Sequence, residues 1–319
     1  MKNNLEDIPF DAVVNKQGTS YAVFRGQLTP RYATVFADIA KGYFFLIAIV
    51  VSLSLLQKHS TVPWWLLIPA GGLFIGYTAA YIALFAHEAS HYNIHPDKKK
   101  NEWLGTLFLC LPFGLSLKSY RKIHWQHHLH LGTPADTEIS YFNHLSGLFI
   151  LETITGVHLL RTMFSKEKST VLNKEQIRES RLMLMAGALL HAGLLTLAFL
   201  TGNWLPALAW IPGFAIFFPF FASIRQLLEH RDELADALTD FRKKPHGKIS
   251  RIFYHTLLSG SFGAAGFTRH MIHHWDPQAS YTRMKDIEQF LEEDDKTAAI
   301  LRDSRTSYTT VLKKLYNAH

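Results

Sequence analysis

The chain has 319 residues, of which 48% are hydrophobic, 13% aromatic and only 18% charged, below the usual quarter for a soluble domain. Its single cysteine, Cys110, excludes an internal disulfide framework and a Cys-rich zinc or iron–sulfur site. The formal net charge of +7 lies almost entirely outside the apolar stretches, which indicates membrane topology rather than nucleic-acid binding.

Long uncharged stretches dominate the chain and run over residues 42–57, 59–86 and 186–224. Apolar runs of about 18 or more residues with few charges are candidates for transmembrane helices. We therefore predict four spans, arranged as two hairpins. Their approximate bounds are 42–57, 64–86, 184–201 and 204–223.

The basic residues are distributed unequally about these spans. Lys58 is the only Lys or Arg in the two turns that join the paired spans. By the positive-inside rule, both termini and the polar segments 87–183 and 224–319 are expected in the cytoplasm. The N-terminal arm, 1–41, has no apolar core typical of a cleaved signal peptide and is predicted to be interfacial.

Shorter elements complete the predicted fold. The stretches 103–117 and 145–160 are apolar but too short to span comfortably, so we expect helices at the membrane surface or re-entering it. A charged helix at 166–181 is expected to lead into the second hairpin, and amphipathic helices at 284–316 to close the cytoplasmic domain. The fold class is thus an all-α integral membrane protein with one domain over 1–319.

Histidines are concentrated on one predicted side of this membrane protein. Eight of them fall into three clusters with helical spacing: His87 and His91; His124, His127 and His128; and His270, His273 and His274. Residues spaced by three or four share a helix face, and neutral imidazole binds iron, copper, zinc and nickel. The sequence therefore predicts a metal centre on the cytoplasmic side.

Several kinds of metal protein have such residues. His87 and Glu88 open a His-Glu-x-x-His pattern that ends at His91, which is typical of zinc proteases. A protease needs about three zinc ligands, however, and two further clusters remain. A metal transporter is expected to carry ionisable residues within its spans, and here His191 is almost the only one.

Eight clustered histidines exceed the needs of one ion and favour two. Two histidine-bound irons can activate dioxygen and remove hydrogen from an unactivated C–H bond. That chemistry suits a membrane protein acting on an alkyl chain, which could enter from the bilayer over the segments 103–117 and 145–160. His130, three residues after His127, and the nearby Asp136 are candidates to support the ligands.

The three clusters resemble the histidine boxes of the membrane fatty acid desaturase superfamily, whose members include hydroxylases. The run from Tyr120 to Asp136, with Asn101-Glu-Trp-Leu-Gly105 before it, is similar to bacterial members. The resemblance covers most of the chain and implies a bacterial inner-membrane protein. It also implies two Fe ions, O2 as co-substrate, His230 as a ninth ligand, and Gln226 reaching a metal through water.

The resemblance implies a desaturase that introduces a double bond into the acyl chain of a membrane lipid or acyl thioester. A lipid, alkane or carotenoid hydroxylase or ketolase with the same boxes is the alternative within the superfamily. No His-Pro-Gly-Gly haem motif occurs, and one cysteine cannot bind an iron–sulfur cluster. Electrons are therefore expected from a separate donor of ferredoxin or cytochrome b5 type, with its reductase.

Overall fold

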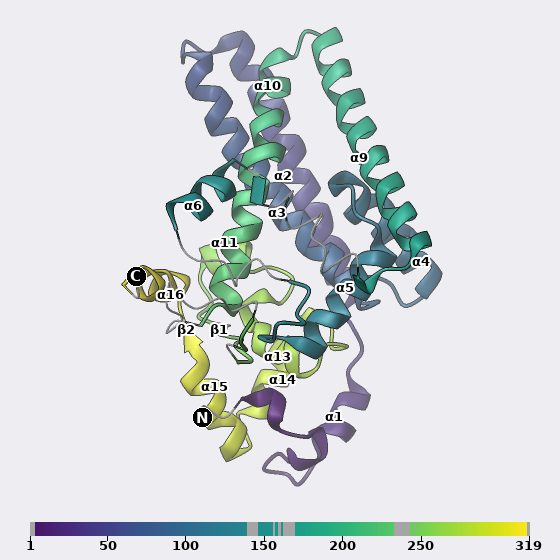
Figure 1. Cartoon of the computed structure of the whole chain (residues 1–319), viewed down its shortest axis with the longest axis vertical. Helices are drawn as coiled ribbons and strands as arrows, with labels where there is room; N and C mark the ends of the chain where they lie inside the picture. Colours follow the sequence, from purple (N-terminus) through teal and green to yellow (C-terminus); the bar gives the residue numbers. More distant parts are fainter. Residues whose placement is uncertain are drawn as a thin grey trace.

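Four long helices form two hairpins that rise from one end of a mixed helical domain (Figure 1). The computed structural model describes residues 4–138, 146–155, 157–158, 161, 170–232, 243–245 and 247–317. Four helical stretches within these residues are long and apolar enough to cross a membrane. The predicted all-α membrane fold with four spans is confirmed.

The first hairpin pairs α2 (Tyr32–His59) with α3 (Trp64–Ser90). Pro30 lies just before α2, and Pro63 is the N-cap of α3. The proline ring restricts the preceding residue and has no N–H to donate, so both prolines mark positions where a helix readily begins. Ser60 to Pro63 form the short turn at the tip of the hairpin.

The second hairpin pairs α9 (Lys174–Leu200) with a composite helix made of α10 (Trp204–Pro212), the π-helical segment η6 (Gly213–Phe217) and α11 (Phe218–His230). Asn173 caps α9 by accepting a 2.8 Å hydrogen bond from the backbone N–H of Gln176. Pro212 and Pro219 lie on either side of η6. Because each proline removes a helical donor, the locally widened turn is a physical consequence of the sequence.

The helices are longer than the predicted spans. Helix α2 begins at Tyr32 rather than at 42, so the predicted arm 1–41 ends inside the first long helix. Helix α9 begins at Lys174 rather than at 184 and absorbs the end of the charged helix predicted at 166–181. Hydropathy marks the apolar part of a helix, whereas the backbone ladder continues through polar turns until a breaker or cap ends it.

Glycines on α3 allow the two hairpins to approach closely. A Cβ atom at Gly76 would lie 2.7 Å from the carbonyl oxygen of Gly213, a distance that real Cβ atoms do not adopt. Small residues allow this close backbone approach between membrane helices. Helix α3 therefore contacts α2, α10, η6 and α11. The inner ends of α3 and α11, which carry His87 and His230, lie at the same end of the bundle (Figure 1).

The two short apolar stretches form helices beside the bundle. The first consists of α4 (Lys98–Leu104), the π-helical segment η3 (Gly105–Cys110) and the 3-10 turn η4 (Leu111–Phe113). The second contains α6 (Gly147–Ile154), and residues 145, 156, 159 and 160 of the predicted stretch lie outside the described residues. Trp103, Phe108 and Leu148 are exposed, as expected for side chains that face lipid.

A polar network inside the bundle ties the first short stretch to the second hairpin. His191 on α9 contacts the carbonyl oxygen of Pro112 through Nε2 at 2.8 Å, and its Nδ1 accepts a 3.0 Å bond from the indole of Trp210. Since Trp210 can only donate, His191 must carry its proton on Nε2. Both nitrogens of this intramembrane histidine are satisfied, which explains its presence without a transport role.

The remaining elements form the polar domain. They are η1 (Leu5–Asp7), η2 (Phe10–Ala12), α1 (Tyr21–Gln27), α5 (Leu117–His130), β1 (Ile252–Phe253), α12 (Leu257–Phe262), η7 (Phe267–Arg269), α13 (His270–Trp275), η8 (Tyr281–Arg283), α14 (Met284–Leu291), α15 (Asp295–Ser304), β2 (Arg305–Thr306) and α16 (Tyr308–Asn317). The two short strands pair in parallel, with Ile252 opposite Arg305. The predicted amphipathic helices at 284–316 correspond to α14, α15 and α16.

The N-terminal arm belongs to this domain, and its predicted interfacial position is replaced by packing in a core. Leu5, Val13 and Tyr21 are fully buried. The Tyr21 hydroxyl donates a 2.7 Å hydrogen bond to Asp276, and the Trp275 indole donates a 2.8 Å bond to the carbonyl oxygen of Ile8. The arm thus supports the segment that directly follows the third histidine cluster.

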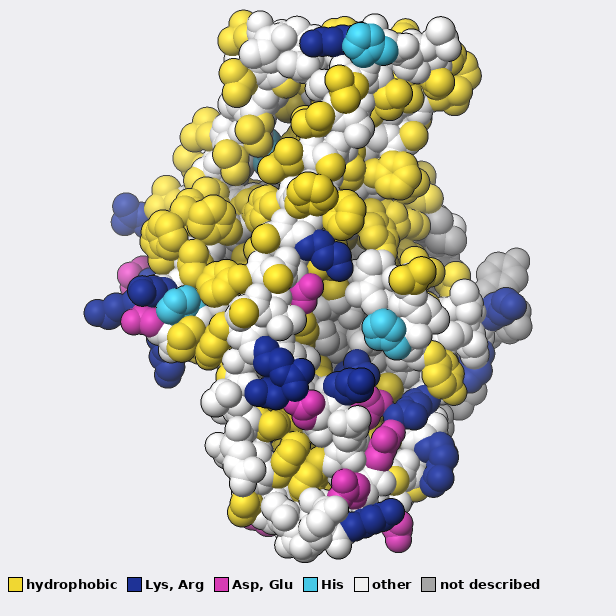
Figure 2. All heavy atoms as spheres, turned by 180° about the vertical axis from the view of Figure 1, so that it is seen from behind, with side chains coloured by type: hydrophobic (Ala, Val, Ile, Leu, Met, Phe, Trp, Pro, Cys, Tyr) yellow, Lys and Arg dark blue, Asp and Glu magenta, His cyan; other side chains and the backbone are white. Residues whose placement is uncertain are grey.

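The surface divides along the long axis of the molecule. Figure 2 shows hydrophobic side chains over the half that contains the hairpins, and charged side chains gathered over the polar domain. The last turn of α2 carries Lys58 and His59 at the hairpin tip, beyond the apolar band. This division is the surface expected of a multi-pass membrane protein with a polar domain on one side.

Candidate metal centre

Four helices supply the nine candidate histidines, and their ends meet where the bundle joins the polar domain. His87 lies in the last turn of α3 and His91 is its C-cap, while His230 is the last residue of α11. Helix α5 supplies His124, His127 and His128, and α13 supplies His270, His273 and His274. All are buried except His128, which is partly buried.

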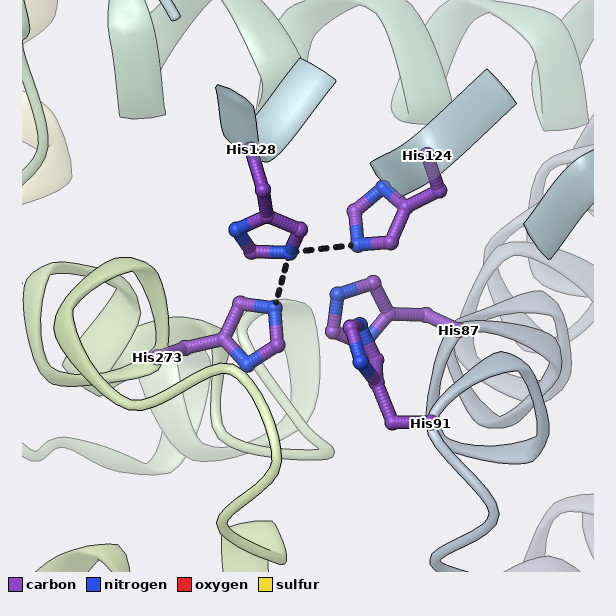
Figure 3. Close-up of side chains that lie close together, drawn as sticks. All are labelled: His87, His91, His124, His128 and His273. Atoms are coloured by element: carbon purple, nitrogen blue, oxygen red, sulfur yellow. Dashed lines mark hydrogen bonds between the residues drawn. The ribbon is translucent and has the colours of Figure 1, made fainter. Parts of the chain in front are cut away.

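The first cluster contains five imidazoles, from His87, His91, His124, His128 and His273. One nitrogen from each lies within 4.8 Å of the others. The Nε2 atom of His128 is 2.9 Å from Nε2 of His124 and 3.0 Å from Nε2 of His273. Figure 3 shows the five rings converging on one point from three separate elements.

The second cluster contains four imidazoles, from His127, His230, His270 and His274, again with one nitrogen each within 4.8 Å. The Nε2 atom of His270 is 2.9 Å from that of His230 and 3.2 Å from that of His274. The clusters are neighbours, because the ring centroids of His128 and His274 are 4.6 Å apart. His230, for which the local pattern was weakest, therefore lies in a cluster.

These distances fit metal coordination. Neighbouring donor atoms around an ion with bonds of about 2.1 Å are separated by about 3 Å. Both ring nitrogens of His87 and of His91 are buried, and none of the described residues forms a hydrogen bond with them. Unsatisfied buried polar atoms cost free energy, which a bound ion would recover. The donor set of nine imidazoles is one that iron, copper, zinc and nickel accept.

Hydrogen bonds at Nδ1 direct the other nitrogen of three histidines into the clusters. The Nδ1 atom of His127 is 2.9 Å from Asp136, that of His124 is 3.1 Å from Glu138, and that of His230 is 2.9 Å from the carbonyl oxygen of Ile249. Such partners fix the tautomer and ring orientation of metal-bound histidine. In each case Nε2 is left for a metal.

Burial keeps most of the ligand histidines neutral. It lowers the pKa values of His91, His128, His273 and His274, and neighbouring imidazoles lower several of them further. Their lone pairs are therefore available at neutral pH. His127 differs. Burial lowers its pKa too, but the carboxylates of Asp136 and Glu138 outweigh that effect and raise the pKa of His127 to about 9.

Three residues, Asp136, His130 and Gln226, are predicted to support the metal ligands, and the structure places them differently. Asp136 is fully buried and bonds His127, as described above. His130 is not part of either cluster, although it follows His127 by one helical turn. The side-chain amide of Gln226 donates a hydrogen bond to a carboxylate oxygen of Glu138. An influence of Gln226 and His130 on a bound metal stays a prediction.

Glu138 is the residue whose importance the sequence did not single out. Its spacing from the histidines does not set it apart from the other acidic residues near the clusters. Its carboxylate contacts His124 at 3.1 Å and lies 3.9 Å from Nε2 of His127. One feature of the sequence could have indicated that Glu138 lies near the clusters. It follows Asp136 by two residues, which places both on the same turn after α5.

The site differs from a zinc-protease site despite the His-Glu-x-x-His pattern. Glu88 is fully buried, and one of its oxygens accepts a 3.2 Å hydrogen bond from the backbone N–H of Tyr281. Its two flanking histidines belong to a cluster of five imidazoles rather than to a three-ligand site. A protease base must instead reach a metal-bound water.

The fold and the two clusters define a multi-pass membrane protein of the histidine-box class. The family model for "Fatty acid desaturase" matches residues 63–306, which include every candidate histidine. The chain belongs to the fatty acid desaturase family, whose members are oxidoreductases with desaturase or hydroxylase activity and di-iron centres. A search of curated proteins finds no significant match.

Proposed function

We propose that this protein is a di-iron, O2-dependent desaturase that introduces a double bond into the acyl chain of a membrane lipid or acyl thioester. The observation that carries the proposal is the pair of adjacent imidazole clusters at the inner end of a membrane-spanning bundle. The five-histidine and four-histidine clusters would hold one iron each. Bound irons would supply the O2 chemistry that removes hydrogen from an unactivated C–H bond.

The overall reaction requires outside electrons. The acyl chain loses two hydrogens as the double bond forms, and O2 is reduced to two waters. The substrate supplies two of the four electrons and two of the four protons, so a donor must supply two electrons and solvent two protons. A ferredoxin or cytochrome b5 type donor with its reductase fits, because the chain's one cysteine cannot hold an iron–sulfur cluster.

The chain's own residues would orient the ligands and keep the site dry. Asp136 and Glu138 hold the imidazoles of His127 and His124. Phe267 lies against both clusters, with its ring centroid 4.7 Å from that of His87 and 4.9 Å from that of His270. An aromatic wall at this point excludes water and is compatible with an alkyl chain.

Membrane access and orientation are part of the same proposal. The segment η3 contacts α3 and α6 contacts α11, and both carry exposed apolar side chains, so an acyl chain would enter from the bilayer beside them. The basic residues of the polar domain favour a cytoplasmic position for the active site and both termini. We propose a bacterial inner membrane as the location, on the resemblance of the second histidine box.

Lipid profiling of cells that express the protein tests the function. The wild type should produce an unsaturated acyl chain absent from cells with the empty vector, whereas His127→Ala should produce none while still inserting in the membrane. A hydroxylated or oxidised product would replace the desaturase by the hydroxylase alternative. Purified wild type with one tightly bound zinc and no iron would overturn the di-iron proposal.

A further inference from the structure

Glu138 lies between the two histidine clusters. Its side chain is 18% exposed and follows the turn after α5. One carboxylate oxygen, Oε1, is 3.1 Å from Nδ1 of His124, a member of the first cluster. The other, Oε2, is 3.9 Å from Nε2 of His127, the atom that this histidine offers to the second cluster.

The two clusters are unequal. The first has five imidazoles and the second has four. Both would serve one kind of ion, which commonly takes up to about six donors. The second cluster therefore has more vacant coordination positions. A separation of 3.9 Å falls between the roughly 3 Å expected for neighbouring donors and the roughly 4.2 Å expected for opposite donors at bonds of about 2.1 Å.

Two hydrogen bonds hold Glu138 in this position. Its backbone N–H donates a 2.8 Å bond to Oδ1 of Asp136, which itself holds His127. The side-chain amide of Gln226, one turn before His230, donates to Oε2. A donor from α11 thus directs this oxygen, leaving a second lone pair on it for another partner.

Three other described carboxylates beside the clusters, those of Asp136, Glu229 and Glu88, already have hydrogen-bond or ion-pair partners. Asp136 accepts bonds from His127, Gly132 and Glu138. Glu229 is paired with Arg225, and Glu88 accepts from the backbone of Tyr281. Nine neutral imidazoles bring no negative charge to two buried cations, and buried charge requires compensation. Glu138 is a carboxylate placed to supply part of that compensation.

We propose that Glu138 is a tenth ligand, which supplies a carboxylate oxygen to the metal of the four-histidine cluster and orients His124 of the other. The carboxylate lies just outside the four-histidine group, so ligation includes a small rotation of its side chain toward the ion. The inference rests on the proposed metal pair and not on the reaction catalysed.

Metal affinity in two half-site backgrounds tests this role. His87→Ala removes a ligand of the first cluster, and His274→Ala removes one of the second, so each background isolates the opposite site. Iron(II) is titrated anaerobically into full-length protein in detergent against a competing chelator. Glu138→Gln is compared with Glu138→Ala and with Glu102→Gln, a control in which the partly buried carboxylate of Glu102 on α4 pairs with Arg121 on α5.

The expected pattern is selective. In the His87→Ala background, Glu138→Gln should weaken iron binding by at least about 10-fold, the loss typical of groups that support a metal site. In the His274→Ala background it should have little effect, because a glutamine oxygen still accepts the His124 bond. Glu138→Ala should weaken both sites, and Glu102→Gln neither. Mössbauer spectra of Glu138→Gln should show one of two iron signals altered.

Unchanged affinity of the four-histidine site in Glu138→Gln would overturn the proposal, and so would a loss confined to the five-histidine site. These outcomes are separate from the fate of the proposed function. Wild type that binds two irons but makes no unsaturated lipid leaves the Glu138 role intact. If the wild type makes the unsaturated lipid but Glu138→Gln binds iron normally, the proposed function stands and the Glu138 role fails.

Discussion

His127 and His128 are adjacent in the chain, yet their imidazoles belong to different histidine clusters, with ring centroids 5.9 Å apart. Consecutive residues of an α-helix differ in direction by about 100°, whereas residues four apart share a face. His128 therefore joins His124, and His127 faces the other cluster. Helix α13 repeats the arrangement, since His270 and His274 share one cluster and His273 lies in the other.

This division predicts different losses for neighbouring substitutions. His127→Ala should leave the five-histidine site loaded, so that iron falls from about two ions per chain to about one, and product should disappear. His128→Ala should instead empty the five-histidine site, so that iron again falls to about one ion per chain. Iron analysis with Mössbauer spectroscopy distinguishes the two. His130→Ala is the matched control and should retain both irons, because His130 lies outside both clusters.

Asp136→Asn should weaken iron binding at the four-histidine site by about 10- to 100-fold, the usual cost of removing a carboxylate that orients a metal-bound histidine. The amide replaces the carboxylate that contacts Nδ1 of His127 at 2.9 Å. Chelator competition in the His87→Ala background measures the change. Equal affinity for the Asn variant and the parent would contradict an orienting role for Asp136.

Metal loading should release about one proton per chain at pH 7.5. The metal-free protein holds a proton on His127, because its pKa is raised to about 9, whereas the lowered pKa values of His270 and His274 leave those rings neutral. Metal must displace the His127 proton. The apparent affinity of this site should therefore rise about tenfold per pH unit up to pH 9 and level off above it.

Calorimetric titration in buffers of different ionisation enthalpy counts the released protons. Asp136→Asn removes one of the charges that raise the pKa of His127, so proton release at pH 7.5 should fall. Release that stays at one proton in this variant would show that another group carries the proton.

His191→Leu should destabilise the bundle without changing the metal content. It removes the contacts of His191 with Pro112 and Trp210, at 2.8 and 3.0 Å. Hydrogen bonds between membrane helices contribute about 0.6 to 2 kcal/mol each, so a loss of about 1–3 kcal/mol is expected. Thermal unfolding in detergent measures it. His59→Leu, at an exposed position on the hairpin tip, should have little effect.

Much of this arrangement could be predicted from local sequence patterns. Uncharged stretches locate the hairpins, since lipid excludes charge, and helical spacing groups the histidines of α3, α5 and α13. Periodicity could not locate the start of α2 at Tyr32 or of α9 at Lys174, because polar turns continue a helix that hydropathy no longer marks. It also could not indicate the core packing of the arm around Tyr21.

The role of Glu138 and the division of each histidine box arise from tertiary contacts. Glu138 meets Gln226 across 88 positions of sequence, and His273 meets His128 across 145. Spacing within one helix indicates that His127 and His128 point in different directions. It does not reveal what lies in each direction. Only the packing of α3, α5, α11 and α13 around one point assigns each ring to its cluster.

The contribution of α13 to both clusters has a consequence for biogenesis. His273 completes one cluster, and His270 and His274 complete the other, so neither site has its full ligand set until the last third of the chain has been synthesised and docked. Iron insertion would therefore be a late step that follows membrane insertion of all four spans. Ions bound there would stabilise the docked state by mass action, so that metal loading would report complete assembly of the domain.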